Sequence, residues 1–271
     1  MRFLKGHGTE NDFVILPDFD GELEVTAALV AQICDRRAGI GADGVLRVVR
    51  AKLSHEASDQ AGRAEWFMDY RNADGSMAEM CGNGVRVFAR YLIEAGLAES
   101  AEFGIATRGG IRRVRMESSG DVSVDMGRPT VYGESVASLG GHEFVGLHVD
   151  MGNPHLACVI GEPVAQLDLT HQPGFDPGVF PTGVNIEFLN AVGERRALMR
   201  VFERGVGETR SCGTGAVATA VAAAALTGET TGTWAVEVLG GTLTVTLDEH
   251  TSYLAGPAAI IAEGDLRHLA E

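Results

Sequence analysis

Two cysteines of the chain stand in matching glycine-rich turns. Cys81 lies in the segment MCGNG (80–84) and Cys212 in the segment SCGTG (211–215), and an apolar stretch follows each one. An ordinary thiol with a pKa of about 8.5 is only about 3% ionised at pH 7, whereas the unpaired N–H groups at a helix start favour the thiolate. The glycines allow the backbone to approach a ligand closely. We therefore predict two reactive thiols, each at the start of a helix.

Two acid/base groups of the same kind are what inversion of a carbon stereocentre requires. One thiolate removes the α-proton of an amino acid, and the other thiol returns a proton to the opposite face. N–H donors aimed at the α-carboxylate stabilise the carbanion more than the ground state. This chemistry needs no cofactor, and the sequence holds no glycine-rich phosphate cradle, no pyridoxal-binding signature and no close cysteine pairs typical of structural zinc sites.

The remaining cysteines, Cys34 and Cys158, have apolar neighbours and are expected to be packed in the core. Two other interpretations of the reactive pair stay open at this point. The thiols could form a redox pair that closes to a disulfide, or they could belong to a non-catalytic thiol sensor or binding module.

The composition restricts the class of protein and partner. The chain of 271 residues has a formal net charge of −15 and a pI near 4.9, which disfavours nucleic acid and anionic membranes as partners and favours a small molecule. With 45% hydrophobic residues it can bury a large core. The N-terminal residues lack the apolar run of a signal sequence, and we expect a cytoplasmic protein.

Short runs with the pattern of β-strands recur along the chain and are separated by Gly, Pro, Asn and Asp. A helix is expected from an N-cap at Thr26 to Arg37, and two more after the reactive cysteines. The expected strands are 12–15, 44–49, 65–70, 112–116, 121–126, 156–160, 184–189, 197–202, 234–239, 243–247 and 259–262.

The chain also matches itself, which indicates a duplication. The two cysteine turns lie 131 residues apart, as do Asn72 and Glu203, whereas Asn11 and Asn153, and likewise Asp43 and Asn185, lie 142 residues apart. The difference of 11 residues falls on a polar segment, 51–63, which we interpret as an inserted surface loop without an assigned role.

The duplication predicts an α+β fold of two pseudo-symmetric α/β domains. Each would be a mostly antiparallel sheet wrapped around a central helix, with the active site in the cleft between the domains. The helix that includes 216–226 has almost no polar face and should be enclosed on all sides, whereas the helix after Cys81, with Arg86, Arg90 and Glu94, should be less enclosed. The expected domains are 1–128 and 129–262, and the tail 263–271 is expected to return to the first.

Seven motifs in the same order resemble the diaminopimelate epimerase family, within the pyridoxal-independent racemase and epimerase superfamily. They extend from the N-terminal region to the second cysteine turn. The motifs are GTENDF (8–13), RAGIGADG (37–44), NADGS (72–76), CGNGVR (81–86), MGNPH (151–155), GVNIE (183–187), and ERGVGET (203–209) followed by CGTG (212–215).

The resemblance implies conversion of LL-diaminopimelate to the meso isomer, a step that supplies lysine and peptidoglycan precursors, often by a homodimer. It also assigns roles to residues. Cys81 and Cys212 are implied to be the acid/base pair, and His155 and Glu203 to adjust their protonation. Backbone and side chains of Gly82, Asn83, Gly213 and Thr214 are implied to bind the reacting carboxylate, and Asn11, Asn72, Asn153, Asn185 and Arg204, with Glu203 near the reacting centre, the rest of the substrate.

A proline or hydroxyproline racemase of the same superfamily is the nearest alternative. Such substrates lack a second amino-acid end, so the cluster of distal polar residues with Arg204 favours diaminopimelate.

Overall fold

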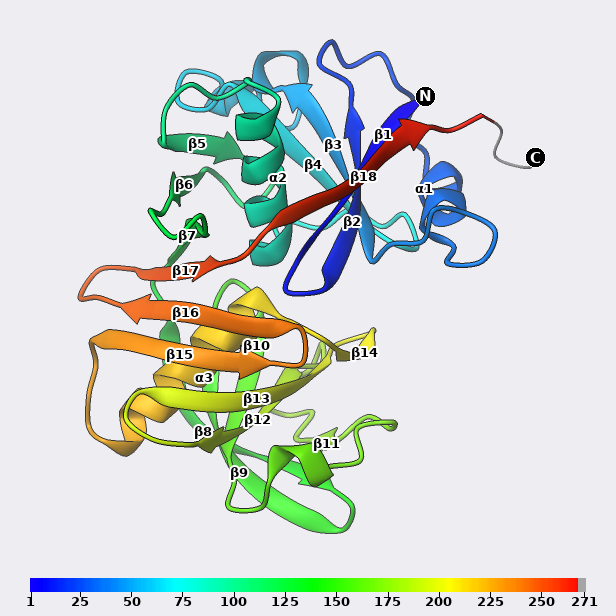
Figure 1. Cartoon of the computed structure of the whole chain (residues 1–271). Helices are drawn as coiled ribbons and strands as arrows, with labels where there is room; N and C mark the ends of the chain where they lie inside the picture. The colour runs from blue at the N-terminus through cyan, green and yellow to red at the C-terminus, as the bar shows by residue number, and fades with distance from the viewer. Residues whose placement is uncertain (268–271) are drawn as a thin grey trace. The chain divides into compact units, whose positions relative to one another are not determined.

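The computed structural model describes residues 1–267, and the chain divides into two compact units (Figure 1). Unit 1 combines residues 1–124 with the C-terminal residues from Pro257, and unit 2 comprises residues 125–256. The domain boundaries expected from the sequence, near 128 and 262, stay a prediction. The expected return of the tail 263–271 falls in part on residues 268–271, outside the described residues.

Unit 1 consists of strands around one long helix, with a second, short helix at its edge. Strand β18 lies against β1 although the two are far apart in sequence, and β2 pairs with β1 on the other side (Figure 1). The elements are β1 (Arg2–Gly8), β2 (Asn11–Pro17), α1 (Ala27–Cys34), β3 (Gly44–Arg50), the 3₁₀ helices η1 (Ala51–Leu53) and η2 (Ser58–Gln60), β4 (Trp66–Asn72), α2 (Gly82–Glu94), β5 (Glu102–Ala106), β6 (Arg112–Met116), β7 (Val122–Gly127), which crosses the unit boundary, and β18 (Ala259–Asp265).

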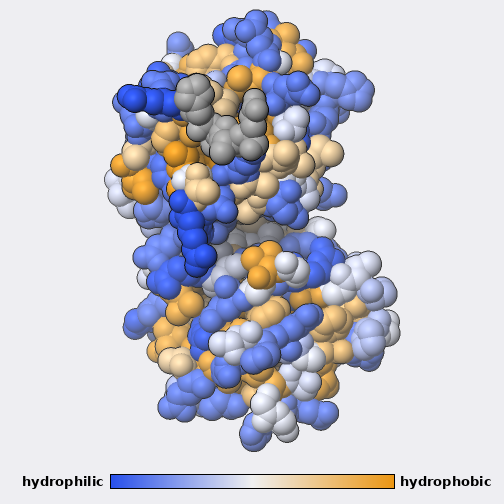
Figure 2. Space-filling view, turned by 90° about the vertical axis from the view of Figure 1, so that its right-hand side faces the viewer, coloured by the Kyte–Doolittle hydropathy of each residue, from blue (hydrophilic) through white to orange (hydrophobic). Residues whose placement is uncertain are grey.

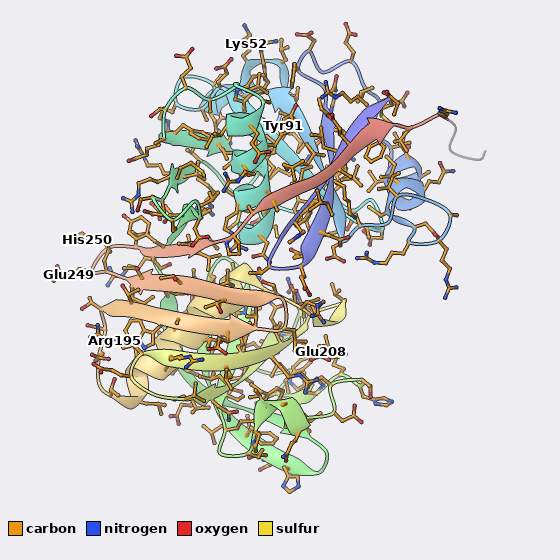
Figure 3. All side chains as sticks on the ribbon, viewed as in Figure 1. Lys52, Tyr91, Arg195, Glu208, Glu249 and His250 are labelled. Carbon is orange, nitrogen blue, oxygen red and sulfur yellow. The ribbon has the colours of Figure 1, made fainter. Side chains whose placement is uncertain are left out.

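Unit 2 repeats this plan around its own helix. Figure 3 shows Arg195 and Glu208 near opposite ends of its strand β13. The elements are β8 (Thr130–Leu139), β9 (His142–Asp150), β10 (Pro154–Val159), the 3₁₀ helix η3 (Val164–Gln166), β11 (Gly174–Phe175), β12 (Asn185–Ala191), β13 (Arg196–Glu203), β14 (Gly207–Thr209), α3 (Gly213–Leu226), β15 (Gly232–Val238), β16 (Gly241–Leu247) and β17 (Ser252–Gly256).

The order and direction of strand pairing confirm the duplication. In unit 1, β1 is antiparallel to β2, β2 parallel to β3, β3 antiparallel to β4, and β4 parallel to β5. In unit 2, β9, β10, β12, β13 and β15 follow the same sequence of directions. The predicted α+β class, with two pseudo-symmetric and mostly antiparallel units, is therefore confirmed.

The pairing register corrects one residue match made from the sequence. Phe13 pairs with Gly44 in the parallel ladder β2–β3, and His155 pairs with Asn185 in the ladder β10–β12. Asn185 thus corresponds to Gly44 and not to its neighbour Asp43. Because side chains alternate between the faces of a strand, this shift by one residue changes which side chains are equivalent in the two units.

The central helix of each unit is enclosed by strands. α2 contacts β1, β2, β3, β4, β6 and β18, and α3 contacts β9, β10, β12, β13, β15, β16 and β17. For α3 this was expected, because its sequence is apolar on all sides. The expectation that α2 is less enclosed was wrong, since Arg86 is fully buried and Arg90 lies mostly inside.

Helix α1 ends three residues earlier than the sequence predicted, at Cys34 instead of Arg37. The N-cap is as expected, because the Thr26 hydroxyl accepts the N–H of Leu29. At the other end the Asp35 carboxylate accepts the N–H groups of Arg37 and Ala38. Those donors are thereby diverted into a turn and no longer extend the helix.

The segment 51–63 is mostly exposed, as expected of an inserted surface loop, but it is partly ordered and three of its side chains are buried. It forms η1 and η2, and Ala51 and Ala57 are fully buried in a small apolar cluster with Phe67 of β4. The buried side chain of Gln60 donates from Nε2 to the carbonyl of Thr107 at 2.9 Å. The insertion therefore extends the core of unit 1 at its margin.

The viewed face in Figure 2 is mostly hydrophilic, with smaller groups of hydrophobic residues among the charged ones. This agrees with the acidic composition of the chain. Among residues 1–267, none of the helices is long and apolar enough to cross a membrane.

Candidate active site

Cys81 is the N-cap residue of α2. Its backbone is extended, with φ −138° and ψ 119°, and Sγ accepts a hydrogen bond from the N–H of Gly84 at 3.4 Å. A side-chain acceptor at this position satisfies one of the free N–H groups of the first helical turn. The same bond, together with the helix dipole, favours negative charge on the sulfur.

Cys212 is the N-cap residue of α3 in the same geometry. Its φ is −125° and ψ 119°, and Sγ accepts the N–H of Gly215 at 3.4 Å. The hydroxyl oxygen of Thr214 lies 3.6 Å from the sulfur. Each reactive cysteine predicted from the sequence thus stands at a helix start, in its own unit.

The surroundings of Cys81 are amides and one cation. The Asn11 amide oxygen lies 3.7 Å from Sγ and also accepts from Nδ2 of Asn83 at 3.2 Å. Oδ1 of Asn83 in turn accepts from Nη2 of Arg86 at 2.9 Å. Arg86 comes from the second turn of α2 and is fully buried, so a guanidinium lies beneath the first cysteine turn.

The surroundings of Cys212 are carboxylates. Burial raises the pKa of this thiol well above its usual value, and the negative charges of Glu203 and Glu187 raise it further. The Thr214 hydroxyl and the Gly215 N–H oppose that shift. Glu203 accepts a short hydrogen bond from the Thr209 hydroxyl, and burial raises the pKa of Glu203 as well.

His155 connects this acidic cluster to the substrate-binding candidates. It is fully buried, with Nδ1 at 2.7 Å from Oε1 of Glu187 and Nε2 at 3.2 Å from Oδ1 of Asn153. Each ring nitrogen of His155 thus faces an oxygen, one from a carboxylate and one from an amide. His155 therefore belongs to the surroundings of the second cysteine, in unit 2.

Each of the predicted asparagines has hydrogen-bond partners within its own unit. Nδ2 of Asn11 donates to Asp43 at 2.7 Å, and Nδ2 of Asn72 donates to the Ser76 hydroxyl at 3.0 Å. Nδ2 of Asn153 lies 3.5 Å from the Thr214 hydroxyl. These contacts hold the amide groups in place. An amide oxygen can accept two hydrogen bonds, so an oxygen that accepts one within the protein can accept a second from a ligand.

Asn185 and Arg204 form a second local contact in unit 2. Oδ1 of Asn185 accepts the backbone N–H of Arg204 at 3.0 Å, and Nδ2 donates to the carbonyl of Pro154 at 3.0 Å. The Arg204 side chain is only partly covered, and its Nη1 donates to the Thr182 carbonyl and hydroxyl at 3.2 Å each. A guanidinium with this much solvent access retains donors for a ligand carboxylate.

Two residues next to the cysteines were missed from the sequence, Arg86 and Glu187. Both belong to recognised motifs, but neither has a spacing that marks it as functional. The signal that could have found them is the comparison of the repeats, in which Arg86 stands opposite Val217 and Glu187 opposite Leu46. A charge that occurs in only one of two equivalent positions is not required by the shared fold, which indicates a local role.

The other two cysteines are packed as expected. Burial raises the pKa of Cys34 to about 11 and that of Cys158 to about 12. Cys34 packs in the apolar cluster beneath α1, and Cys158 in the cluster that includes Phe188 of β12. Both thiols are therefore protonated and unreactive at neutral pH.

Solved structures share this fold at low sequence identity. A PhzF-family phenazine biosynthesis protein from Bacillus anthracis matches with a TM-score of 0.70 at 16% identity, over 99% of both chains. A hydroxyproline epimerase from Agrobacterium vitis matches with a TM-score of 0.63 at 14% identity, over 97% of this chain and 91% of that one. At these identities the likeness concerns the fold alone.

Sequence relatives are much closer. Diaminopimelate epimerase of Thermobifida fusca is 57% identical over 98% of both chains, and that of Mycolicibacterium smegmatis is 51% identical over 98% of this chain and 97% of the relative. The family model described as diaminopimelate epimerase matches residues 3–132 and 147–261. The chain belongs to the diaminopimelate epimerase family of isomerases.

Proposed function

We propose that this isomerase converts LL-2,6-diaminopimelate to the meso isomer and that Cys81 and Cys212 are its acid/base pair. The observation that carries the proposal is the repeated N-cap. In each half of a chain of this family a cysteine sulfur accepts the N–H of the third helical residue at 3.4 Å. The same device built twice provides the two matched groups that stereoinversion needs.

In the proposed reaction one cysteine is a thiolate and the other a thiol. The thiolate takes the α-proton, the electron pair of the C–H bond passes into the α-carbon and its carboxylate, and the thiol gives its proton to the opposite face. Two thiols have then exchanged protonation states, so the reverse reaction uses the same groups. N–H groups at the two helix starts, with Gly82, Asn83, Gly213 and Thr214, stabilise the carboxylate as its charge increases.

The remaining candidates have supporting roles in this proposal. His155 and Glu203 adjust the protonation of Cys212, since both belong to its acidic surroundings. Asn11, Asn72, Asn153, Asn185 and Arg204 hold the distal amino-acid end, for which a partly exposed guanidinium is suited. We place the enzyme in the cytoplasm, as a homodimer, in the synthesis of lysine and peptidoglycan precursors.

Isotope incorporation tests the proposal directly. The purified protein is incubated without added cofactor with LL-diaminopimelate in heavy water, and isomer composition and α-carbon deuterium are followed together. Formation of the meso isomer with deuterium at the inverted carbon is expected. A protein that binds diaminopimelate but leaves its α-hydrogens unlabelled is a binding module and not an epimerase.

Cysteine variants and a second substrate complete this experiment. C81S and C212S should each lose inversion while retaining the circular dichroism spectrum of the wild type, and C34S is the matched control that should remain active. trans-4-Hydroxy-L-proline in place of diaminopimelate tests the related activity, and inversion of that substrate alone would replace diaminopimelate in the proposal.

A further inference from the structure

The two cysteine turns have the same backbone but opposite electrostatic surroundings. At equivalent positions unit 1 has Phe13 and Leu46, and unit 2 has His155 and Glu187. A Cβ added to Gly84 would meet Leu46 at 3.3 Å and Phe13 at 3.5 Å, whereas one added to Gly215 would meet Oε1 of Glu187 at 2.6 Å. The apolar wall behind the first turn is therefore replaced by a carboxylate behind the second.

In the helices it is unit 1 that has the extra charge, and this charge is positive. Five residues after its cysteine, α2 has Arg86 and α3 has Val217, and both side chains are fully buried. Asn72 of unit 1 corresponds to Glu203 of unit 2, whose carboxyl group interacts with Cys212. Unit 1 thus combines its cysteine with a buried cation, and unit 2 combines its cysteine with a buried carboxylate, a partly buried one and an imidazole.

Arg86 is short of compensating partners. Its Nη2 donates to Oδ1 of Asn83 at 2.9 Å and to the Thr9 hydroxyl at 3.1 Å, and both acceptors are uncharged. Within the described residues, Nε and Nη1 are buried and have no hydrogen-bond partner. Burial lowers the pKa of Arg86 to about 10, which reflects the cost of a buried cation that lacks a full counter-charge.

Few groups can supply that counter-charge. Of the elements packed against α2, the groups that act on the Arg86 guanidinium as negative charges are the Cys81 sulfur and then Asp121, next to β7. The guanidinium also fits closely against the first hairpin, since a Cβ on Gly8 would lie 3.0 Å from its Nη2. Arg86 is therefore held in place by glycine, threonine and asparagine at the first cysteine turn.

We propose that Arg86 is a positioning residue that acts as the buried counter-ion of the Cys81 thiolate, so that in the free enzyme Cys81 is the base and Cys212 the acid. An ionised Cys81 loses its 3.7 Å contact with the Asn11 oxygen but keeps the Gly84 N–H, and it is attracted by the Arg86 guanidinium, which is hydrogen-bonded to Asn83 of the same turn. Burial, and then the carboxylates of Glu203 and Glu187, favour the proton on Cys212. The proposal rests on the two-cysteine mechanism, and it states in which order the thiols are charged before substrate arrives.

The test is the pH dependence of alkylation at each cysteine in the intact protein without substrate. Iodoacetamide is added between pH 5 and 10, and peptide mass spectrometry gives the rate of each thiol as a function of pH; the shape of each curve gives the midpoint, and a rate still rising at pH 10 places the midpoint above the range tested. In the wild type the midpoint for Cys81 is expected below that for Cys212. R86M should raise the Cys81 midpoint by about one pH unit and lower the rate of Cys81 below that midpoint accordingly.

Two further variants separate charge from packing. R86K retains a cation and should restore most of the Cys81 rate, whereas R90M removes an arginine one turn further along α2 and should leave the Cys81 midpoint unchanged. Equal midpoints for Cys81 in folded R86M and wild type would overturn the proposal. If R86M does not fold, the order of the two midpoints in the wild-type protein is the test. A Cys212 midpoint at or below that of Cys81 then overturns the proposal.

The alkylation experiment and the isotope experiment test the two proposals independently. Alkylation needs no substrate, so a correct order of midpoints in a protein that does not label diaminopimelate contradicts only the proposed function. Labelled product from a protein whose Cys81 does not respond to R86M contradicts only the role of Arg86.

Discussion

Glu203 shows how one side chain controls the chemistry of a neighbouring residue. Burial raises the pKa of Cys212, and the partly buried carboxylate of Glu203 raises it further. E203Q removes the negative charge and retains an oxygen that can accept from Thr209. We expect the Cys212 midpoint for alkylation to fall by about one pH unit, since one unit corresponds to about 1.4 kcal/mol of interaction.

The control for this variant is E237Q, which removes an equal charge from a partly exposed carboxylate paired with Arg196 on the surface of unit 2. It should leave the Cys212 midpoint where it is. A Cys212 midpoint that is the same in E203Q and E237Q means that Glu203 does not act on the thiol.

Asp12 is a second residue whose charge matters, in this case for stability. It accepts from Lys5 at 2.6 Å and from Arg36 at 2.7 Å, next to Asn11 of the first cysteine's surroundings. Burial alone would raise its pKa, but Arg36 and Lys5 outweigh that effect and lower it to about 2. The ordinary value is near 3.9, so the ionised form stabilises the folded protein above that pH and this contribution is lost as pH falls through about 2.

D12N should therefore destabilise unit 1 by about 1 to 2 kcal/mol at pH 7, and the difference from wild type should shrink as pH falls below about 4. Urea unfolding at several pH values from 7 to 3 measures this. D20N is the control, because Asp20 pairs with Arg50 in an exposed position and should cost less than about 0.5 kcal/mol. A gap for D12N that is constant with pH would show that the lost contribution is packing and not charge.

At the scale of elements, the first turns of α2 and α3 offer a matched pair of substitutions. A Cβ at Gly84 is 3.3 Å from Leu46, a contact that a leucine can relieve by a small shift, whereas a Cβ at Gly215 is 2.6 Å from Oε1 of Glu187. Alanine favours a helix by up to about 1 kcal/mol over glycine. G84A should therefore be close to neutral in stability, and G215A should displace Glu187 and be clearly destabilising.

Thermal unfolding and epimerisation of both variants check this expectation. G215A should lower the midpoint temperature by several degrees and reduce turnover more than G84A, because the displaced carboxylate pairs with His155. Equal effects of the two alanines would show that the carboxylate moves aside without cost.

The elements were largely predictable from the sequence, and the reasons are local. Alternation and turn residues identify strands such as β3 and β13, and the two cysteine turns identify α2 and α3. The early end of α1 was not predictable, because it depends on an Asp35 side chain that competes for N–H groups. The burial of Ala51 and Ala57 was missed for another reason: these alanines give no periodic signal, and they become part of a core only by packing with side chains such as Phe67 of β4 and Ala106 of β5.

Only those residues of the candidate site that stand out in sequence motifs were predictable. Motif and duplication together identify Cys81 and Cys212, but they do not distinguish one from the other. That distinction lies in Arg86 and Glu187, whose proximity to the sulfurs depends on sheet register and on the packing of α2 and α3. A one-residue error in the register, as in the match of Asn185 with Asp43, hides the equivalence of Glu187 and Leu46.

At the scale of the whole molecule, the chain leaves unit 1 after residue 124 and returns to it at Pro257. The returning strand β18 pairs with β1 along most of its length, from Arg2 with Asp265 to His7 with Ala259. Hydrogen exchange should show β18 and β1 opening as one unit. D12N should accelerate exchange in both strands by the same factor, and β17, only a few residues before β18 in the sequence, is the internal reference.

Exchange in β18 that follows β17 and not β1 would contradict this prediction. It would mean that proximity in sequence, and not the ladder with β1, determines the stability of the C-terminal strand.

The same ladder has a consequence for biosynthesis. Residues 125–256 are continuous, so the second half of the protein has all its strands as soon as they have left the ribosome. The first half emerges earlier, yet one edge of β1 stays without its partner until the last strand is translated. Unit 1, whose first strand is made earliest, is thus completed only after unit 2, and a nascent chain carries an open strand edge, with its tendency to associate, until residues 259–265 have been translated.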